Sequence, residues 1–416
     1  MRQGKQRMLR ALAAAGLLAT IGCSSYSGGP AASSDSAEAA TRQGKARIPD
    51  DELRKRGLES IWYSGPDPAD TAVQHVTLLT EGLFVATAPV NKETGRLKLI
   101  HRENGTPVWY TEIEEPLRNG PSVFRYPTGP QRRPDEVYFT QLDTVYCLDY
   151  RYGDILWKEQ LSFPISTRIA VDDNNYFAGS DNGRVFGLKK RSPVEEWTYR
   201  TGGSIQGSPA VDQPAVYVSS TDGSIYRFAG ATGWTRGLSW KVDTGSRIIG
   251  DPVVFSRWVL AGSTDYKLYC LEQDGGIFWT FQAEAPIEDA PVVYSYGSNQ
   301  DFAYVIGVNR TRRDEQRTLF SVKLTTGQEV WRRSGVRKVI SMGKRNLYLL
   351  EDGDGPGQRD IVAVDALGGQ EKFRLRATGF QFFPTNHADH GRNTAERGRI
   401  YLVAADGTMQ LIGERL

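Results

Sequence analysis

The chain has 416 residues, of which 44 are glycine, 20 proline and 4 methionine, and aromatic residues make up 11%. So many turn-forming and ring-bearing residues indicate a turn-dense β protein, and 24% charged with 39% hydrophobic residues exclude a collagen, a coiled coil and a wholly disordered chain. The formal net charge of +2 gives no indication of nucleic-acid binding, and no apolar run reaches the ~18 residues of a membrane-spanning helix.

The first 22 residues are predicted to be a secretory signal peptide. Residues 1–10 carry four basic residues and no acid, and residues 11–21 are almost wholly apolar. A basic region followed by a short apolar region is typical of such a signal. Its removal leaves 47 of the 51 Lys and Arg residues against 49 Asp and Glu, a net charge of −2. The slight excess of basic residues therefore belongs to the signal.

The segment from Ala19 to Cys23 resembles a bacterial lipobox, although Thr20 stands where leucine is usual. This resemblance implies that Cys23 is diacylated and anchors the chain, because two or more acyl chains give stable membrane binding. Ser24 is similar to the residue that follows the cysteine in lipoproteins sorted to the outer membrane. The alternative is an ordinary signal peptide with an incidental cysteine. Residues 23–57 are predicted to be a flexible tether that ends in a short helix near Pro49.

Residues 58–416 repeat an aromatic residue at intervals of 39 to 52 residues. A period of ~44 residues is typical of the blades of a β-propeller. One ring at a fixed strand position in every blade would pack neighbouring blades together. The eight ring positions are Trp62, Trp109, Trp157, Trp197, Trp240, Trp279, Trp331 and Phe373.

Alternating strands and hairpin turns lie between the ring positions. Residues 216–220 precede Asp222-Gly223, and residues 176–180 precede Asp181-Asn182-Gly183. These dipeptides favour hairpins because glycine accepts the positive φ that the turns require. The last unit has no ring residue after it, so residues 59–63 are expected to supply its outer strand. The sequence thus predicts an all-β, eight-bladed β-propeller of four-stranded antiparallel blades, closed by an N-terminal strand.

The spacing from Cys147 to Trp157, and that from Val322 through Gly327 to Trp331, resemble the quinoprotein-type (PQQ-like) propeller repeat. Together with the lipobox, they make residues 58–416 resemble the BamB family of lipoproteins of the outer-membrane barrel-assembly machine. The resemblance implies a binding scaffold with no enzymatic activity and no cofactor. It implies a monomeric propeller within a complex, at the outer membrane facing the periplasm, with the barrel-assembly protein as partner.

Two other functions stay open from the residues. A PQQ-dependent dehydrogenase shares the repeat and would hold PQQ with Ca²⁺ in the channel, and a propeller of the cell envelope could instead bind carbohydrate or a surface protein. Cys147 and Cys270 are not adjacent, so the vicinal cysteine pair of quinoprotein dehydrogenases is absent. Both cysteines are interpreted as small buried residues in equivalent places. No catalytic residue and no metal ligand are assigned.

A few polar clusters are further candidates for sites. The segment from His387 to His390 contains two histidines and an aspartate, for which a solvated loop is favoured over a metal site. His75 and His101 are interpreted as ordinary strand or turn residues. The basic stretches 310–317 and 332–338 are either solvated loops, the favoured interpretation, or one partner-binding surface, and residues 131–134 are treated in the same way.

Overall fold

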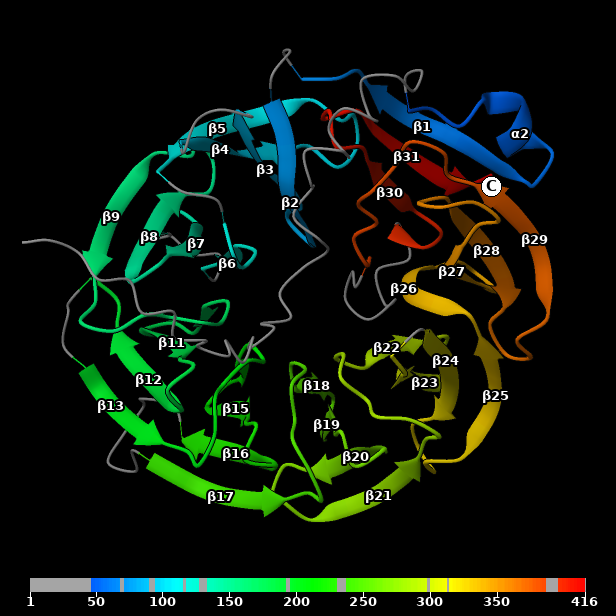
Figure 1. Cartoon of the computed structure of the whole chain (residues 1–416). Coiled ribbons are helices and arrows are strands. Elements are labelled where there is room, and N and C mark those ends of the chain that lie inside the picture. Colours follow the sequence, from blue (N-terminus) through cyan, green and yellow to red (C-terminus); the bar gives the residue numbers. More distant parts are fainter. Residues whose placement is uncertain are drawn as a thin grey trace, which may run out of the picture.

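The computed structural model describes residues 46–67, 71–89, 94–114, 117–126, 133–191, 195–229, 237–297, 300–312, 314–386 and 396–415. These residues form eight antiparallel sheets set around one axis, as the blades of a propeller (Figure 1). The predicted all-β, eight-bladed architecture is confirmed. The predicted signal peptide, Cys23 and the segment from His387 to His390 lie outside the described residues. Within the described ranges, no helix has the length and apolar character needed to cross a membrane.

The first four blades each contain four strands, in order from the axis outward. Blade 1 consists of β2 (Thr71–Leu79), β3 (Gly82–Pro89), β4 (Gly95–Ile100) and β5 (Pro107–Ile113), and blade 2 of β6 (Ser122–Phe124), β7 (Glu136–Gln141), β8 (Thr144–Asp149) and β9 (Ile155–Gln160). Blade 3 consists of β10 (Ala170–Val171), β11 (Asn175–Gly179), β12 (Arg184–Lys189) and β13 (Glu195–Arg200), and blade 4 of β14 (Ala210–Asp212), β15 (Ala215–Ser219), β16 (Ser224–Ala229) and β17 (Gly237–Asp243).

Blades 5 to 7 follow the same order. Blade 5 consists of β18 (Val253–Phe255), β19 (Trp258–Gly262), β20 (Lys267–Glu272) and β21 (Ile277–Gln282). Blade 6 consists of β22 (Val292–Ser295), β23 (Asp301–Arg310), β24 (Glu315–Lys323) and β25 (Glu329–Ser334), and blade 7 of β26 (Val336–Met342), β27 (Asn346–Asp352), β28 (Arg359–Asp365) and β29 (Glu371–Arg376).

Blade 8 joins the two ends of the described chain. It consists of β30 (Ile400–Val403), β31 (Met409–Glu414) and β1 (Leu58–Ser64), and β1 pairs with β31 in antiparallel fashion. The predicted closure by an N-terminal strand is therefore confirmed. This sheet has three strands rather than the expected four, and an isolated bridge between Phe382 and Val403 takes the place of the innermost strand. Pairing both ends of the chain in one sheet leaves the ring without an open seam.

The helix α2 (Asp50–Arg54) precedes β1 and lies beside blade 8 (Figure 1). Ala46, Ile48 and Leu53 are buried in one apolar cluster with residues of blades 7 and 8. The Gln410 side chain accepts a hydrogen bond of 2.9 Å from the Ile48 N–H and donates one of 3.0 Å to its carbonyl. Residues 46–57, which the sequence placed in the tether, thus pack on the propeller, because a few apolar residues suffice where they meet a preformed surface.

Apolar clusters between the faces of neighbouring blades form the core. Where blade 1 meets blade 8, a buried ion pair joins Arg102 to Glu396. The Arg102 guanidinium also donates to the Tyr401 hydroxyl at 3.1 Å and to the Leu79 carbonyl at 3.0 Å. Ring closure therefore rests on polar contacts as well as on the pairing of β1 with β31.

Candidate protein-binding surface and axial channel

Each ring position lies in the outermost strand of its blade and packs on the blade that follows. Trp109, Trp279 and Trp331 are buried, and their indole N–H groups donate to a backbone carbonyl of the next blade over 2.7 to 3.0 Å. Trp62 makes the same contact with the Arg102 carbonyl at 2.8 Å, which carries the pattern across the seam. These rings therefore fix one blade against the next.

A glycine of the next blade lies beneath most of these rings. Gly153, Gly327 and Gly369 have φ between 70° and 75°, and a Cβ added to any of them would lie 2.6 or 2.7 Å from the indole above it. Only glycine meets both requirements at such a turn, the positive φ and the absence of a side chain. The ring and the glycine beneath it are thus one structural device.

The other ring positions depart from this pattern. Trp240 is partly exposed, although its indole N–H donates to the Gln273 carbonyl at 2.9 Å. The buried indole nitrogens of Trp157 and Trp197 have no hydrogen-bond partner among the described residues. Phe373 is partly buried against the cluster between blades 7 and 8.

Cys147 and Cys270 are free and fully buried, as the sequence predicted. They occupy equivalent places, because Cys147 pairs with Trp157 and Cys270 with Trp279 across the two outer strands of their blades. Burial raises the pKa of each thiol to about 12. Both cysteines are therefore held as protonated, unreactive packing residues.

From each ring position, a row of residues paired across neighbouring strands runs inward to the innermost strand of the blade. In blade 5, Trp279 pairs with Cys270, Cys270 with Leu260, and Leu260 with Val253 of the innermost strand. The same steps can be followed in blades 1 to 7. The rows end on the innermost strands at Thr77, Ser122, Ala170, Ala210, Val253, Val292 and Ser341.

The residue two places before each row's inner end lies in the innermost strand or just before it. In blade 7 the offset is three places because β26 has a bulge between Val339 and Ser341, and in blade 8 Phe382 takes the place through its bridge to Val403. We call this set the axial ring. Its members are His75, Gly120, Arg168, Ser208, Asp251, Ala290, Lys338 and Phe382.

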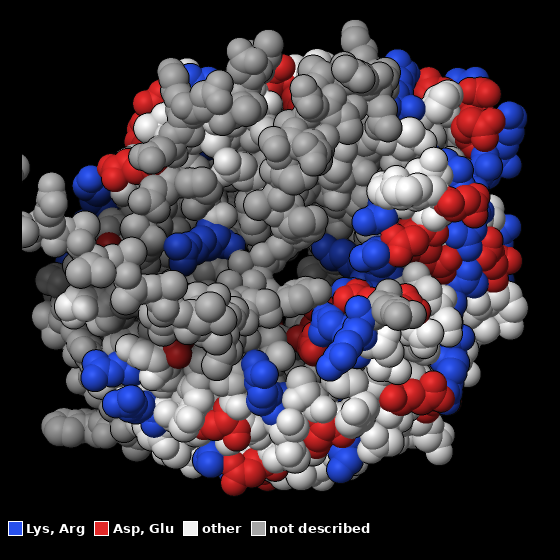
Figure 2. All heavy atoms as spheres, in the orientation of Figure 1, with Lys and Arg blue, Asp and Glu red and all other residues white. Residues whose placement is uncertain are grey.

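Members of the axial ring contact one another from different blades. A guanidinium nitrogen of Arg168 in blade 3 lies 3.7 Å from a carboxylate oxygen of Asp251 in blade 5. The Ser208 N–H donates to Asp251 at 2.7 Å, and a Cβ on Gly120 would lie 3.0 Å from Nε2 of His75. Figure 2 shows the opening at the centre of one face, with Lys and Arg side chains on both sides of it.

The field in this channel acts on His75 and Lys338. Burial, followed by the positive charges of Lys338 and Arg168, lowers the pKa of His75 to about 4. Lys338 and Asp289 are exposed to solvent, although many protein atoms surround them. Desolvation by these atoms lowers the pKa of Lys338, against the opposing effect of Asp289, and raises the pKa of Asp289 despite Arg317, which lies 3.8 Å away. His75 lies in β2, as expected of a strand residue, and is neutral at pH 7.

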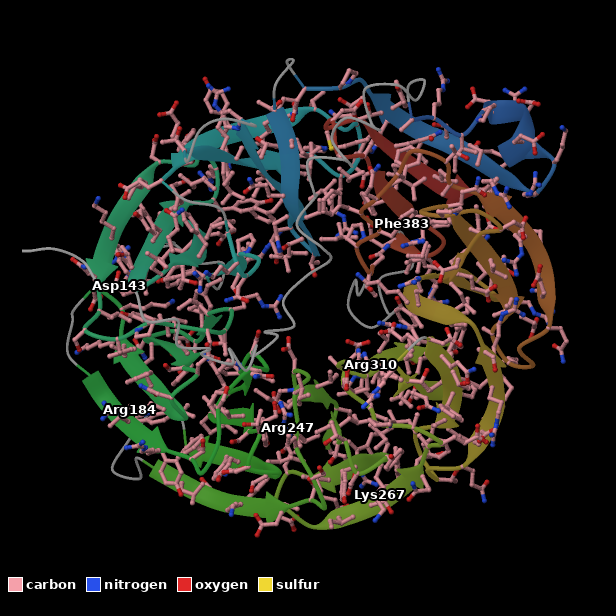
Figure 3. The ribbon with its side chains drawn as sticks, viewed as in Figure 1. Asp143, Arg184, Arg247, Lys267, Arg310 and Phe383 are labelled. Carbon is pink, nitrogen blue, oxygen red and sulfur yellow. The ribbon has the colours of Figure 1, made fainter. Side chains whose placement is uncertain are left out.

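Most of the basic stretches are neutralised by neighbouring acids. Arg310 pairs with Glu288 and with Glu315 (3.0 Å), and Arg337 pairs with Asp352 at 2.6 Å. Further pairs join Arg317 to Glu315, Arg332 to Glu284 and Glu329, and Arg333 to Glu351 and Glu371. In Figure 3, Arg310 lies nearer the central opening than Arg184 or Lys267. The five arginines in these pairs are therefore neutralised by acids and do not form a free basic surface.

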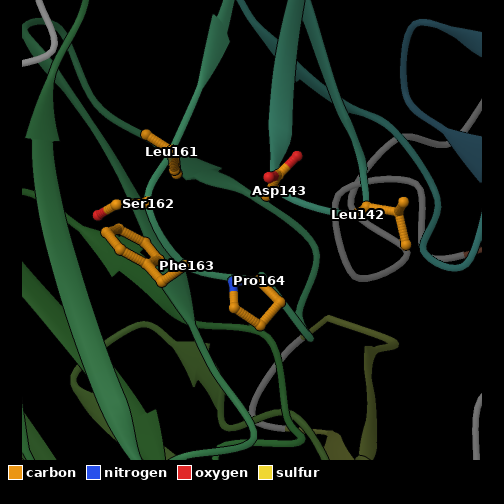
Figure 4. A pocket seen from close by; sticks show the side chains of 6 residues that line it. All are labelled: Leu142, Asp143, Leu161, Ser162, Phe163 and Pro164. Atoms are coloured by element: carbon orange, nitrogen blue, oxygen red, sulfur yellow. The ribbon is translucent and has the colours of Figure 1, made fainter. Parts of the chain in front are cut away.

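A shallow hollow of about 300 Å³ lies where blade 2 meets blade 3 (Figure 4). The tip of the β7–β8 hairpin supplies Leu142 and Asp143, and the loop to blade 3 supplies residues 161–164. The loop is bound to the hairpin tip, because the Leu161 N–H donates to the Asp143 carbonyl at 2.8 Å and the Ile165 N–H to the Leu142 carbonyl at 3.2 Å. An apolar side chain of a partner could therefore enter a preformed site.

Leu142 is unusual in both conformation and exposure. It has φ of 51° and an exposed fraction of 46%. Tyr266, in the corresponding hairpin of blade 5, has φ of 73° and an exposed fraction of 43%, whereas Gly183 and Gly223 fill that place in blades 3 and 4. A non-glycine residue in this region costs roughly 1 kcal/mol or more, and such strain gathers at functional sites. These two hairpin tips are therefore candidates for contact with a partner.

The hollow lies within the segment that resembles a known family. A family profile described as "Outer membrane protein assembly factor BamB" matches residues 141–236. The crystal structure of BamB from Moraxella catarrhalis superposes with a TM-score of 0.59 at 18% identity, covering 86% of this chain and 97% of that one. The chain is similar to BamB.

The other comparisons concern the fold alone. The crystal structure of the computationally designed Ika8 protein superposes with a TM-score of 0.57 at 14% identity, covering 85% of this chain and 99% of that one. No curated protein matches the chain. The likeness to BamB and to a designed protein shows that the chain is a PQQ-like, BamB-like propeller. It does not determine the function, which has to be argued from the site.

The sequence identified the ring positions but missed the axial ring and the hairpin tips. His75 and Lys338 carried no motif, because they become equivalent only through strand register and across a bulge in β26. A signal for the tips was present: Leu142 and Tyr266 stand in turns where other blades have Asp-Gly or Asn-Gly. An apolar residue in a turn of that kind can be found from sequence alone.

Proposed function

We propose that the chain is a non-enzymatic, protein-binding scaffold of the cell envelope. In this proposal Cys23 carries the lipid anchor, and the propeller stands at the outer membrane facing the periplasm. Its partner is the outer-membrane barrel-assembly protein, which the likeness to BamB suggests. The propeller acts as a monomer within that complex, without a cofactor.

The hollow beside Leu142 is the observation that carries this proposal. It combines an exposed leucine in a strained backbone with a bound loop, and it lies inside the segment 141–236 that matches the BamB profile. Apolar anchors in pockets supply most of the binding energy of protein interfaces. A partner residue that covers Leu142 would also offset the energetic cost of exposing it.

Capture of the lipidated protein tests the proposal. The tagged chain is solubilised from native membranes in mild detergent, and co-purifying proteins are identified by mass spectrometry. We expect the barrel-assembly protein to be enriched over a control with an unrelated lipoprotein. Leu142→Asp should reduce its recovery at least about tenfold, the loss of one interface anchor, whereas Leu367→Asp, at a leucine with an exposed fraction of 37% in blade 7, should not.

The outcome against the proposal is equally concrete. Absence of an enriched protein, or equal recovery with Leu142→Asp and the unchanged chain, would contradict it. Thermal unfolding is then measured with PQQ and Ca²⁺, and with glycans. Stabilisation by PQQ with Ca²⁺ would favour the quinoprotein alternative, because a ligand that binds the folded state raises the midpoint of unfolding. Stabilisation by a glycan would favour a carbohydrate-binding propeller.

A further inference from the structure

Every outer strand of the propeller has a β-bulge directly before its ring position. In blade 5, Ile277 pairs with Leu271 and Trp279 with Cys270, so that Phe278 between them has no partner on the neighbouring strand. A bulge changes the direction in which such a side chain points. Phe278 has an exposed fraction of 40%, and Ile277 beside it one of 52%. An apolar pair therefore lies open to solvent on the outer strand of blade 5.

The first turn of blade 5 places an arginine and a further tryptophan beside this pair. Trp258, which is not one of the eight ring positions, is buried and stacks on Phe278 with the ring centroids 5.9 Å apart. The Arg257 guanidinium lies over both rings, 5.2 Å from the Trp258 centroid and 5.8 Å from that of Phe278. Ser256 before it has φ of 56°, which is uncommon for a residue other than glycine. We call Arg257, Trp258, Ile277 and Phe278 the aromatic platform.

Arg257 is exposed and has no ion pair in the part of the chain that the structure describes. It differs in this from Arg310, Arg332 and Arg333, each of which pairs with a carboxylate. Stacking on two rings restricts the guanidinium plane and uses none of its N–H donors. An arginine held in this way can receive a carboxylate from outside the chain.

We propose that the aromatic platform binds a segment of a protein partner that carries a carboxylate next to an apolar side chain. The carboxylate accepts paired hydrogen bonds from the Arg257 guanidinium, and the apolar side chain covers Ile277 and Phe278. Arginine and aromatic residues are enriched in protein interfaces and among the residues that contribute most to binding. The platform combines both kinds of residue at one exposed place.

The platform and the hairpin tips lie at opposite ends of the blades. β19 begins at Trp258 and leads to the tip that contains Tyr266, and the hollow beside Leu142 lies at the corresponding tip of blade 2. The two surfaces therefore belong to opposite faces of the propeller, and one chain can hold a partner on each. Loss of binding at the platform leaves the capture that depends on Leu142 unaffected.

Charge around the platform favours a single carboxylate over an anionic membrane. Asp274 is exposed in the turn between β20 and β21, and Asp212 of blade 4 accepts a hydrogen bond of 2.8 Å from that turn. Anionic membranes attract clusters of about four or more Lys and Arg residues. Arg257 is the only such residue within 255–258 and 272–279, the segments that form the platform. A lone cation among acids suits one carboxylate of a protein.

Peptide display tests the platform. A phage-displayed library of random linear peptides is selected on the immobilised full chain and counter-selected on Arg257→Gln, which removes peptides that bind elsewhere. We expect the remaining peptides to share an Asp or Glu next to an aromatic or aliphatic residue. In fluorescence anisotropy, replacing that carboxylate by its amide should weaken binding about tenfold or more, the loss of a charge-assisted hydrogen bond.

Matched substitutions separate the platform from exposed residues of the same kind. Phe278→Ser, which takes no part in the selection, should weaken binding of the selected peptides about tenfold or more. Val330→Ser, at the bulge of blade 6 with an exposed fraction of 43%, is its control and should leave their affinity unchanged. Arg345→Gln, at an exposed arginine in the first turn of blade 7, is the control for Arg257→Gln. Thermal unfolding shows whether each variant is folded.

A polarity-sensitive dye distinguishes a peptide site from a membrane site. The dye is attached to Phe278→Cys, and the buried thiols of Cys147 and Cys270 do not compete for it. Its emission should not change when vesicles of phosphatidylglycerol are added. A blue shift that the equally labelled Val330→Cys does not show would assign the platform to anionic membranes and overturn the proposal. Failure to select any peptide, selected peptides that need no carboxylate, or equal affinity for folded Phe278→Ser would overturn it as well.

Discussion

The outer and inner ends of the rows that cross the blades follow different rules. At the outer end, seven of the eight ring positions are tryptophan and the eighth is Phe373. At the inner end, the axial ring places a different residue in every blade, from Gly120 and Ala290 to Lys338. The two ends belong to the same repeat and are joined by the same strand pairs. The outer ends of the rows therefore carry nearly the same residue in every blade, whereas the inner ends differ from blade to blade.

This contrast separates stability from recognition within one fold. Where a buried tryptophan lies over a glycine, its loss is costly, because it removes a large apolar contact between two blades. A residue that faces the channel makes few packing contacts and can change with small loss of stability. The eight repeated blades thus form a rigid frame in which a charged residue can stand at a single position. Substitutions at each end of the rows test whether the two differ in this way.

The largest effect is expected at a buried ring position. Trp279→Ala should lower the free energy of unfolding by about 3–5 kcal/mol, because it removes a buried indole and its hydrogen bond to Leu324. Trp240→Ala, at a partly exposed ring, should cost about half as much, since less apolar surface leaves water there. Urea unfolding followed by circular dichroism measures both, and equal losses would contradict the role assigned to burial.

The glycine beneath the ring gives a second, smaller effect. Gly327→Ala places a Cβ 2.7 Å from the Trp279 ring at φ of 70°. Gly357→Ala is the matched control, with φ of 72° and no atom within 4 Å of its Cβ. The control should cost about 1–2 kcal/mol from backbone strain alone, and Gly327→Ala about 1–3 kcal/mol more from the clash. Equal values in urea unfolding would show that the ring yields to the methyl group.

The ring positions could be predicted from the sequence and the axial ring could not, for a physical reason. Trp279 and Trp331 belong to a periodic series because each packs its blade on the next one. Their spacing alone therefore indicated the blades and the closure of the ring. Lys338 and His75 have no counterpart of the same kind in other blades. Only strand pairing shows that they occupy equivalent places in their blades. The hairpin tip at Leu142 is intermediate in how well the sequence predicts it, because Leu142 is an exception to a turn pattern that the sequence shows. Exceptions of this kind can be read only after the repeat has been aligned.

His75 provides the last and smallest test, through the pH dependence of stability. An unfolded histidine has a pKa of ~6.5, whereas the folded protein holds His75 at about 4. Between these values the unfolded chain binds more protons, so the stability that neutral His75 contributes is complete above pH 6.5 and is lost as the pH falls toward 4. His75→Gln removes this group, and its free energy of unfolding should fall by about 2 kcal/mol less than that of the unchanged chain between pH 7.5 and 5.

Urea unfolding at a series of pH values measures this difference, and His101→Gln controls for the loss of a histidine elsewhere. Burial is the largest cause of the lowered pKa, and the positive charges of Lys338 on β26 and Arg168 before β10 act in the same direction. Lys338→Met should therefore recover part of the same stability at pH 5, because a protonated His75 would then meet one positive charge fewer. If His75→Gln retained the full pH dependence of the unchanged chain, the channel would be too well hydrated to act on its side chains. The residues of the axial ring would then differ in sequence from blade to blade but not in their electrostatic surroundings.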